Sequence, residues 1–292
     1  MPALHPSQLT PSFSAIALDQ IASLKKSDRM PVLFLGHGSP MNALPGNEYF
    51  KSWQLLGAQF GLTYPRPQLI LCISAHWLTP GWHLTAMARP KTIHDFGGFP
   101  QELFDQQYPA FGDVAAAQAI AHMVRQRGAA PLRLDAEQWG LDHGTWGVLK
   151  PMFPAADIPV IQLSMDYSRA PSEHYELAQQ LKALRERGVL IVGSGNIVHN
   201  LSQMQRGAPA SQAYDWALEF DQTTGGHIQQ GNLGALQHFL RLGSLAKIAH
   251  PTHEHYLPLL YAAGAVHAGE PRRFFNTNYQ GGAVAMRSVV WG

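Results

Sequence analysis

Three histidines each follow an apolar run that has the composition of a buried strand. His37 follows VLFLG and is flanked by two glycines, His76 follows LILCISA, and His199 lies four residues beyond Gly195, at the end of LIVGSG. In open α/β sheets, ligands bind outside the carboxyl ends of the strands. Neutral imidazole is a common protein ligand for zinc and iron. The three positions together therefore predict a metal site at one edge of a sheet.

A further ligand is expected from another element, because a catalytic metal takes about three protein ligands and keeps a position open for water or substrate. The segment AHPTHEHYLPLL contains His250, His253, Glu254 and His255 directly before an apolar helical run. The start of a helix beside a sheet edge can present one ligand to the site. The residues alone leave open which member of the segment binds.

Two loops combine aromatic residues, glycines and a few polar groups, as small aromatic-substrate pockets do. The segment 92–100, TIHDFGGFP, contains His94, Asp95 and Phe96, and GLDHGTW places His143 beside a glycine and a tryptophan. A tight turn with a capping aspartate and an interior aromatic ring explains either loop equally well. If the segment 92–100 instead contacts the substrate, it is predicted to control which substrate is accepted.

The elements that would position these residues alternate between strand-like and helix-like patterns. Continuous apolar runs are typical of central strands that are covered on both faces. The pattern predicts an α/β fold with a central, mostly parallel or mixed sheet and helices on both faces. The expected strands are 31–36, 68–75, 158–164 and 188–194, and the clearest helices are 112–128 and 172–188, the second with Ser172 as its N-cap.

No linker or internal repeat divides the chain. Residues 1–30, with a short helix expected over 15–25, are predicted to be an N-terminal extension, and residues 31–292 a single catalytic domain. The absence of a signal-like N-terminus and of any apolar stretch of membrane-spanning length leads us to expect a cytoplasmic protein.

Composition narrows the classes of partner. Of the 292 residues 46% are hydrophobic and 14% charged, which allows a substantial core, and the formal net charge is only +1. Without a basic run, neither nucleic acid nor a membrane surface is an expected partner. The single cysteine, Cys72, cannot form a disulfide within the chain. Glycine-loop phosphate motifs, H-E-x-x-H and the G-x-S-x-G elbow are all absent from the sequence.

Six motifs together carry a resemblance to a known family. They are GHGSPMNAL, ISAHW, IHDFGGFP, LDHGTWGVL, GSGNIVHNL and HEHYLPLLYAAGA. In this order they resemble the DOPA 4,5-dioxygenase type of class III extradiol ring-cleavage dioxygenases, over roughly residues 31–290. The resemblance implies cleavage of a catechol, such as DOPA or a related compound, next to its hydroxyl pair, with both atoms of O₂ incorporated. It also implies a mononuclear non-haem metal, iron(II) for activity and zinc as an alternative bound metal.

The resemblance also assigns roles to single residues. It implies that His37, His76 and His255 are metal ligands. His199 matches an acid/base histidine that lies close enough to be a fourth ligand, and His143 resembles a second substrate-facing histidine. The wider class uses two histidines and one carboxylate. With His255 in the third position the site is one negative charge short, which is expected to shift its metal preference toward zinc.

Three functions compete for this site. The first is an extradiol dioxygenase whose partners are a small catechol and O₂. The second is a zinc-dependent hydrolase that uses the same histidines with His199 as base, and the third is a non-catalytic metal- or ligand-binding protein. Oxygen consumption with a catechol separates the first from the other two. The sequence predicts no oligomeric state.

Overall fold

A mixed eight-stranded sheet forms the centre of the molecule in the computed structural model, which describes residues 24–125 and 130–292. The expected helix over 15–25 lies outside the described residues, apart from its last two positions. The sheet has the strand order β4-β3-β5-β2-β6-β1-β10-β7, and β8 pairs with β9 separately. The strands are β1 (Val32–Gly36), β2 (Leu69–Leu78), β3 (His83–Thr85), β4 (Arg133–Asp135), β5 (Val160–Met165), β6 (Val189–Gly195), β7 (Arg272–Phe275), β8 (Tyr279–Gln280), β9 (Val284–Ala285) and β10 (Ser288–Trp291).

Four parallel neighbours, β5, β2, β6 and β1, make up the middle of the sheet, and they correspond to the four apolar runs of the sequence. On one side β10 and then β7 add in antiparallel orientation. On the other side β3 pairs antiparallel with β5, and β4 pairs parallel with β3. The predicted α/β fold with a mostly parallel or mixed sheet is confirmed.

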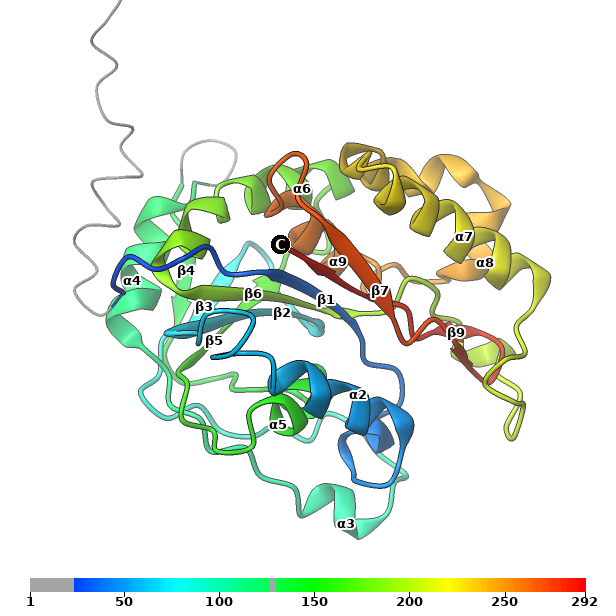
Figure 1. Cartoon of the computed structure of the whole chain (residues 1–292), viewed down its shortest axis with the longest axis horizontal. Helices are drawn as coiled ribbons and strands as arrows, with labels where there is room; N and C mark the ends of the chain where they lie inside the picture. Colours follow the sequence, from blue (N-terminus) through cyan, green and yellow to red (C-terminus); the bar gives the residue numbers. More distant parts are fainter. Residues whose placement is uncertain (1–23, 126–129) are drawn as a thin grey trace, which may run out of the picture.

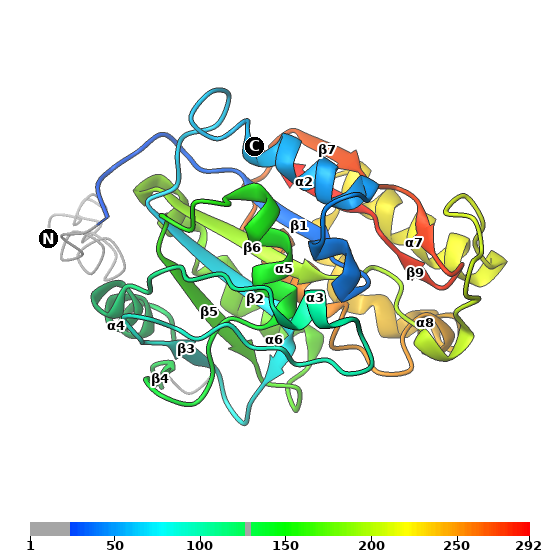
Figure 2. The same cartoon turned by 90° about the horizontal axis from the view of Figure 1, so that it is seen from below.

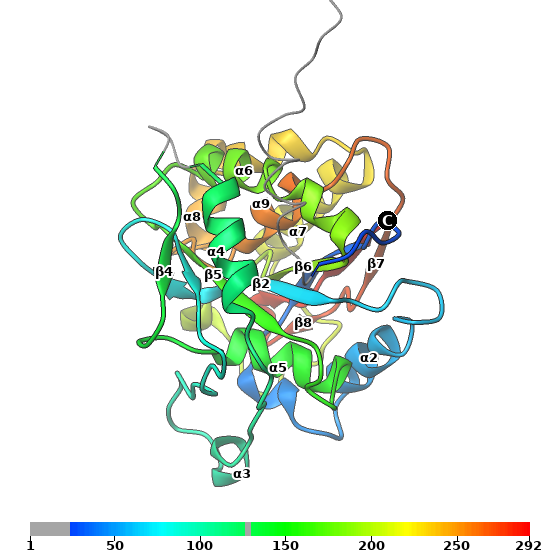
Figure 3. The same cartoon turned by 90° about the vertical axis from the view of Figure 1, so that its left-hand side faces the viewer.

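Helices cover both faces of this sheet (Figure 1). Helices α2 and α5 lie on one face, with α3 beyond them, and α4, α6, α7, α8 and α9 lie on the other, as Figures 2 and 3 show from two further directions. The α-helices are α2 (Glu48–Gly57), α3 (Gln101–Phe104), α4 (Val114–Met123), α5 (His143–Met152), α6 (Pro171–Gln179), α7 (Asp215–Gln229), α8 (Ser244–Ala249) and α9 (Leu257–Gly264). The 3₁₀ helices are η1 (Pro40–Ala43), η2 (Lys182–Arg187), η3 (Leu201–Gln203) and η4 (Leu233–Leu242).

The alternation of side chains along the central strands explains why those strands read as unbroken apolar runs. In β1, Val32 and Phe34 join the core under α9, whereas Leu33 and Leu35 join the core under α2 and α5. Because both faces of the strand are buried, every position along it is apolar. None of the helices in the described residues is long and apolar enough to cross a membrane.

Two predicted elements have different boundaries in the structure. Strand β2 does not stop before His76 but continues to Leu78, with a shift in its pairing to β5. The expected helix 172–188 is divided into α6 and η2, and its N-cap is not Ser172 but Ala170, whose N–H donates to Glu173. Proline at the first helical position explains the earlier start, because its missing N–H has no helical partner to lose.

The other predicted helix, 112–128, is shorter than expected and forms α4. Asp113 is its N-cap and accepts the N–H of Ala116. The glycine expected to close it, Gly128, lies outside the described residues.

The described part of the predicted N-terminal extension packs against the domain. Leu24 and Met30 are buried, and the N–H of Met30 donates to the carbonyl of Arg185 at 3.0 Å. Residues 24–30 therefore contribute to the core that surrounds the start of β1. The domain boundary at residue 30 stays a prediction.

A fully buried arginine joins this segment to the C-terminal part of the chain. The guanidinium of Arg185 donates to both carboxylate oxygens of Glu270, at 2.8 and 2.9 Å, and also to the carbonyls of Met30 and Ala265. Although burial raises the pKa of Glu270, the hydrogen bonds and charge of Arg185 lower it overall. The pair thus stabilises the end of the domain at which β1 begins, opposite the carboxyl ends of the strands.

Candidate functional site

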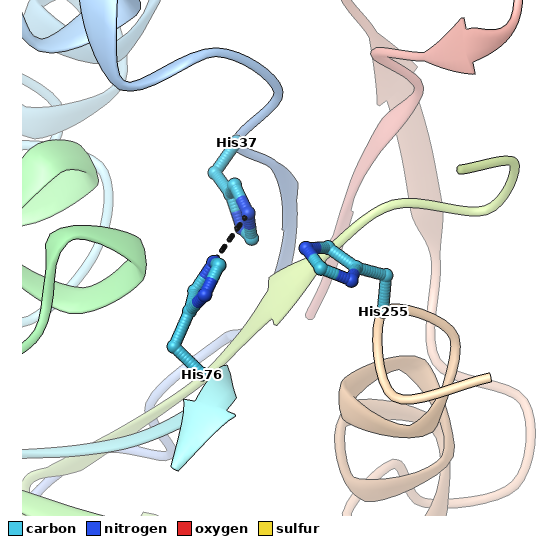
Figure 4. A group of neighbouring side chains, drawn as sticks. All are labelled: His37, His76 and His255. Carbon is cyan, nitrogen blue, oxygen red and sulfur yellow. Dashed lines mark hydrogen bonds between the residues drawn. The ribbon is translucent and has the colours of Figure 1, made fainter. Parts of the chain in front are cut away.

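Three imidazole rings converge at the carboxyl ends of the central strands (Figure 4). His37 directly follows β1, His76 lies near the end of β2, and His255 lies two residues before α9. The Nε2 atoms of His37 and His76 are 3.1 Å apart, and one nitrogen of each of the three rings lies within 4.8 Å of the others. The parallel strand order brings together side chains from distant parts of the chain.

A serine fixes the proton of His37. The hydroxyl of Ser194 donates its only proton to the carbonyl of Gly144 at 2.5 Å, and its oxygen lies 3.0 Å from Nδ1 of His37. Because the hydroxyl proton is already used, Nδ1 of His37 must be the donor in this contact. The lone pair of His37 is therefore on Nε2, the nitrogen that faces His76.

Carboxylates do the same for the other two rings. Nδ1 of His76 lies 3.4 Å from Asp95, and Nδ1 of His255 lies 3.0 Å from Glu254. A carboxylate accepts and cannot donate, so it favours the form of each ring that carries its proton on Nδ1 and leaves Nε2 to bind a metal. A third histidine in place of a carboxylate leaves the ligand set without a negative charge. Asp95 and Glu254 supply negative charge on the far side of the rings, next to Nδ1.

Two glycines allow the backbone to come close enough to build this arrangement. A Cβ on Gly195 would lie 2.2 Å from the carbonyl oxygen of His255, which accepts the N–H of Asn196. A Cβ on Gly144 would lie 2.4 Å from the hydroxyl of Ser74 and 2.9 Å from the His76 ring. Larger residues at either position would displace the segments that carry the histidines.

Burial keeps the converging rings neutral. It lowers the pKa of His76 to about 3 and places the pKa values of His37 and His255 well below their ordinary value, with the neighbouring histidines adding to the effect. A neutral imidazole is the form that binds a metal ion. The cluster is therefore ready to bind a cation at neutral pH.

Two further histidines stand beside the cluster. The His199 ring stacks on His255 with centroids 3.5 Å apart and planes 8° from parallel. The His143 ring lies 4.0 Å from His76 by centroids, and Asp95 accepts the backbone N–H of His143 at 2.9 Å. Burial opposes ionisation of Asp95, but the contacts with His143 lower its pKa to about 2. This carboxylate therefore holds two histidines of the site in place.

All five histidines line one cavity of about 540 Å³, which is within the usual range for small-molecule sites. Phe96 and Phe99 form part of its wall, and their rings pack edge to face with centroids 5.5 Å apart. The Phe96 ring also packs against the His143 ring, with centroids 5.5 Å apart. The cavity thus offers an aromatic wall next to a cluster of nitrogen ligands.

Some predicted residues lie elsewhere. His94 and Asp95 do not line the cavity: Nε2 of His94 lies 2.9 Å from the Gln106 carbonyl oxygen, and Asp95 lies behind the rings of His76 and His143. In the histidine-rich segment, His250 contacts the carbonyl of Ile197 and His253 stacks on Tyr167, so only His255 joins the cluster.

Other residues of the site were not identified from the sequence. Ser194, Arg206 and Gln280 all contribute to it, but they come from the second-last position of β6, a polar loop and a two-residue strand, in that order. Only Ser194 carried a signal, its position between the two glycines that end an apolar run. The acceptor role of Glu254 has no signal beyond its place beside His255.

Comparison with known proteins adds an independent finding. Residues 31–287 match the family model of the catalytic LigB subunit of aromatic ring-opening dioxygenase. The chain is 46% identical to an Escherichia coli (strain K12) protein named 4,5-DOPA dioxygenase extradiol, covering 92% of this chain and 97% of that one. It is 33% identical to the Beta vulgaris protein of the same name, over 87% and 94% of the two chains.

A solved structure has the same fold. It is the crystal structure of an uncharacterized protein from Escherichia coli K12, with 41% sequence identity and a TM-score of 0.75. The match covers 90% of this chain and all of that one.

Proposed function

The chain belongs to the LigB family of aromatic ring-opening dioxygenases, and from that premise we propose how its cavity carries out extradiol cleavage of a catechol. The observation that carries the proposal is the set of three converging imidazoles, each with Nδ1 facing a hydroxyl or carboxylate oxygen behind the ring. We assign His37, His76 and His255 as ligands of the metal on which the family depends. The named relatives are dioxygenases, and nothing favours the zinc hydrolase alternative.

The donor set fits a metal ion of the expected kind. When two nitrogens bind the same ion at about 2.0–2.1 Å, they lie about 3 Å from each other. The Nε2 atoms of His37 and His76 are 3.1 Å apart. Imidazole is a ligand for both iron and zinc. We propose iron(II) as the active metal, with zinc able to occupy the same ligands. When bound, iron(II) would supply the redox chemistry that joins O₂ to the ring.

The remaining histidines handle protons and orientation. His199 is neutral at pH 7, because burial lowers its pKa to about 4, and it can accept a proton from a catechol hydroxyl. The His199 imidazole can then return the proton to the ring as it opens. Its stacking on His255 keeps it beside the proposed ligands. His143, held by Asp95, faces the cavity as a second group for orienting the substrate hydroxyls.

The aromatic wall positions the substrate ring. Phe96 and Phe99 line the cavity, and the Phe96 ring packs against His143. A catechol packed there has its hydroxyl pair directed toward the histidine cluster. The apolar wall also limits the access of water to the reacting carbon atoms. We propose DOPA or a related substituted catechol as the substrate.

Oxygen uptake tests the proposed function. Protein loaded with iron(II) under anaerobic conditions is mixed with a panel of catechols and air-saturated buffer, and O₂ and the yellow ring-opened product are followed together. One O₂ consumed for each ring opened is expected, with a zinc-loaded sample as the matched control that consumes none. Loss of catechol without O₂ uptake, or no turnover of any catechol, would overturn the proposal.

Removing a proposed ligand is expected to release the metal. His37→Ala and His76→Ala should each weaken metal binding by at least about 100-fold, since loss of even a residue that supports a ligand costs 10- to 100-fold. The fold should persist, because both side chains face the cavity rather than the core. Metal content after dialysis and circular dichroism on the same samples measure both effects.

His253→Ala is the control for these variants, because it removes an imidazole two residues from His255 without removing a member of the cluster. It should keep its metal. Full occupancy in both His37→Ala and His76→Ala would exclude the ligand assignment.

Widening the aromatic wall is expected to change substrate choice. Phe96→Ala should raise KM for small catechols by about tenfold and favour bulkier ring substituents, because an aromatic contact of this kind contributes about 1 kcal/mol beyond its buried area. The measurement is kcat/KM over a series of substituted catechols. Phe111→Ala, at a half-exposed ring outside the cavity, is the control. An unchanged ranking in Phe96→Ala would remove this wall from substrate selection.

A further inference from the structure

The cavity wall combines two kinds of side chain. The five histidines contribute ring nitrogens, whereas Leu201, Met204 and Arg206 line the cavity from the segment that follows His199. Among the described residues that line the cavity, Arg206 is the only lysine or arginine, and none is an aspartate or glutamate. The carboxylates Asp95 and Glu254 are turned toward Nδ1 atoms behind the rings. A ligand inside the cavity therefore meets a permanent positive charge and no opposing negative one.

The backbone around Arg206 is held in place by the turn between β8 and β9. The N–H of Gln205 donates to the carbonyl of Gly281 at 3.0 Å, and the N–H of Tyr214 donates to Gly282 at 3.1 Å. Gly207 follows with a φ of 81°, a left-handed conformation that turns the chain directly after the arginine. The base of the side chain is thus fixed at the cavity wall.

The guanidinium of Arg206 is free to bind a ligand. Within residues 24–125 and 130–292, Arg206 has neither an ion pair nor a side-chain hydrogen bond, whereas Arg29, Arg66, Arg169, Arg185 and Arg287 all pair with carboxylates. Gln280, the nearby polar residue of β8, is already occupied: its carbonyl oxygen accepts the Ser39 N–H, and its amide donates to Asn42. Arg206 is therefore the group in the cavity wall that is free to bind a charged substituent.

The size of the cavity leaves room for such a substituent. Its volume of about 540 Å³ exceeds that needed for an unsubstituted ring, and Phe96, whose ring packs against His143, would hold the catechol ring beside the histidines. A side chain on the catechol then extends away from the histidines. Guanidinium binds carboxylate through two parallel hydrogen bonds, a geometry that a neutral or cationic group cannot offer.

We propose that Arg206 recognises a carboxylate on the side chain of the catechol, so that the enzyme selects acidic catechols over neutral ones and rejects catecholamines. The inference rests on the proposed function and specifies the substrate class of the same site. Arg206 is a specificity-determining residue in this account, since it contacts the substituent and takes no part in proton transfer. Rejection of an amine follows from the cation in the cavity and the absence of a carboxylate among its lining residues.

The test compares three catechols that differ in the terminal group of the side chain, which is anionic, neutral or cationic. They are 3-(3,4-dihydroxyphenyl)propionate, its methyl ester and dopamine, each assayed for kcat/KM with iron(II)-loaded protein. The wild type is expected to prefer the acid to the ester by about tenfold, the effect of one charge-assisted contact at a partly exposed position. Dopamine should be the poorest substrate. Salt should weaken the preference, because it screens an exposed charge.

Two variants and a control isolate the arginine. Arg206→Gln should bring the acid-to-ester ratio close to one, and Arg206→Glu should reverse the order in favour of dopamine. Arg66→Gln removes an exposed arginine that pairs with Asp157 outside the cavity, and it should keep the wild-type ratio. Because Arg206 is exposed on a loop, circular dichroism is expected to show an unchanged fold in its variants.

The outcomes separate the two proposals. If the wild type opens none of the three catechols, nor any in the wider panel, the proposed function fails. If it opens them with equal efficiency, or if Arg206→Gln keeps the preference for the acid, only the role of Arg206 is overturned. A preference that disappears in Arg206→Gln and reverses in Arg206→Glu supports recognition of the carboxylate.

Discussion

Replacement of His199 by glutamine is expected to slow ring opening by about 10²–10⁴-fold, the range for loss of an acid/base group. Metal content should be retained, because the three proposed ligands and their Nδ1 partners are untouched. Glutamine is similar in length to histidine and neutral, so it fills the space beside His255 without offering a basic nitrogen. Single-turnover ring opening and metal content, measured on one preparation, test the expectation.

The pH profile distinguishes proton transfer from metal binding. Since the pKa of His199 is lowered to about 4 by burial, the wild-type rate should fall only as the pH approaches that value, where the imidazole becomes protonated. His199→Gln should lack this decline. If His199 were an obligatory ligand, the variant would lose metal and regain activity with added iron(II). A metal-loaded variant with wild-type rates across the pH range would remove His199 from the mechanism.

Replacement of Arg185 by methionine is expected to lower the free energy of unfolding by about 3–5 kcal/mol, because it leaves the carboxylate of Glu270 without its buried partner. Arg185 is fully buried, and four of its hydrogen bonds are lost together. Denaturant unfolding followed by circular dichroism measures the change. An effect below about 1 kcal/mol would contradict this account of the pair.

Arg29 offers a matched control, because its exposed guanidinium contacts the same Glu270 at 3.4 Å. Arg29→Met should cost less than about 1 kcal/mol, as exposed ion pairs do. The pH dependence has a definite sign. Since the folded pKa of Glu270 lies below its ordinary value of 4.5, its stabilising contribution is complete above that pH and is lost as the pH falls below it. Arg185→Met should weaken this dependence.

The centre of the sheet could be predicted from the sequence, and its edges could not. Each central strand is buried on two faces and carries its own apolar run, as in VLFLG of β1. The outer strands β3, β4 and β7 have three or four residues each and are partly exposed. Their pairing depends on neighbours that are distant in the chain, so they leave no local pattern. The break between α6 and η2 is likewise absent from the helical spacing of the leucines.

The site was predictable wherever a residue type is rare and its position follows a strand. His37 and His76 satisfy both conditions, and the structure places both in the cluster. The choice of His255 over its neighbours came from the family resemblance, because nothing in the residues separates it from His250 or His253. The groups that fix the proton positions, such as the Ser194 hydroxyl, are common residue types whose role exists only through tertiary contact. The ligand and catalytic roles themselves stay predictions until they are tested.

The distance along the chain between the converging histidines has a consequence for thermal stability. With His76 and His255 as ligands, one ion would act as a cross-link between positions 179 residues apart (255 − 76), and loops of this length lose the most entropy when they are closed. A metal concentration 100 times its Kd would stabilise the fold by about 2.7 kcal/mol. Melting temperature should therefore rise with free metal and drop on chelation, so storage buffers that contain chelators would shorten the working life of the enzyme.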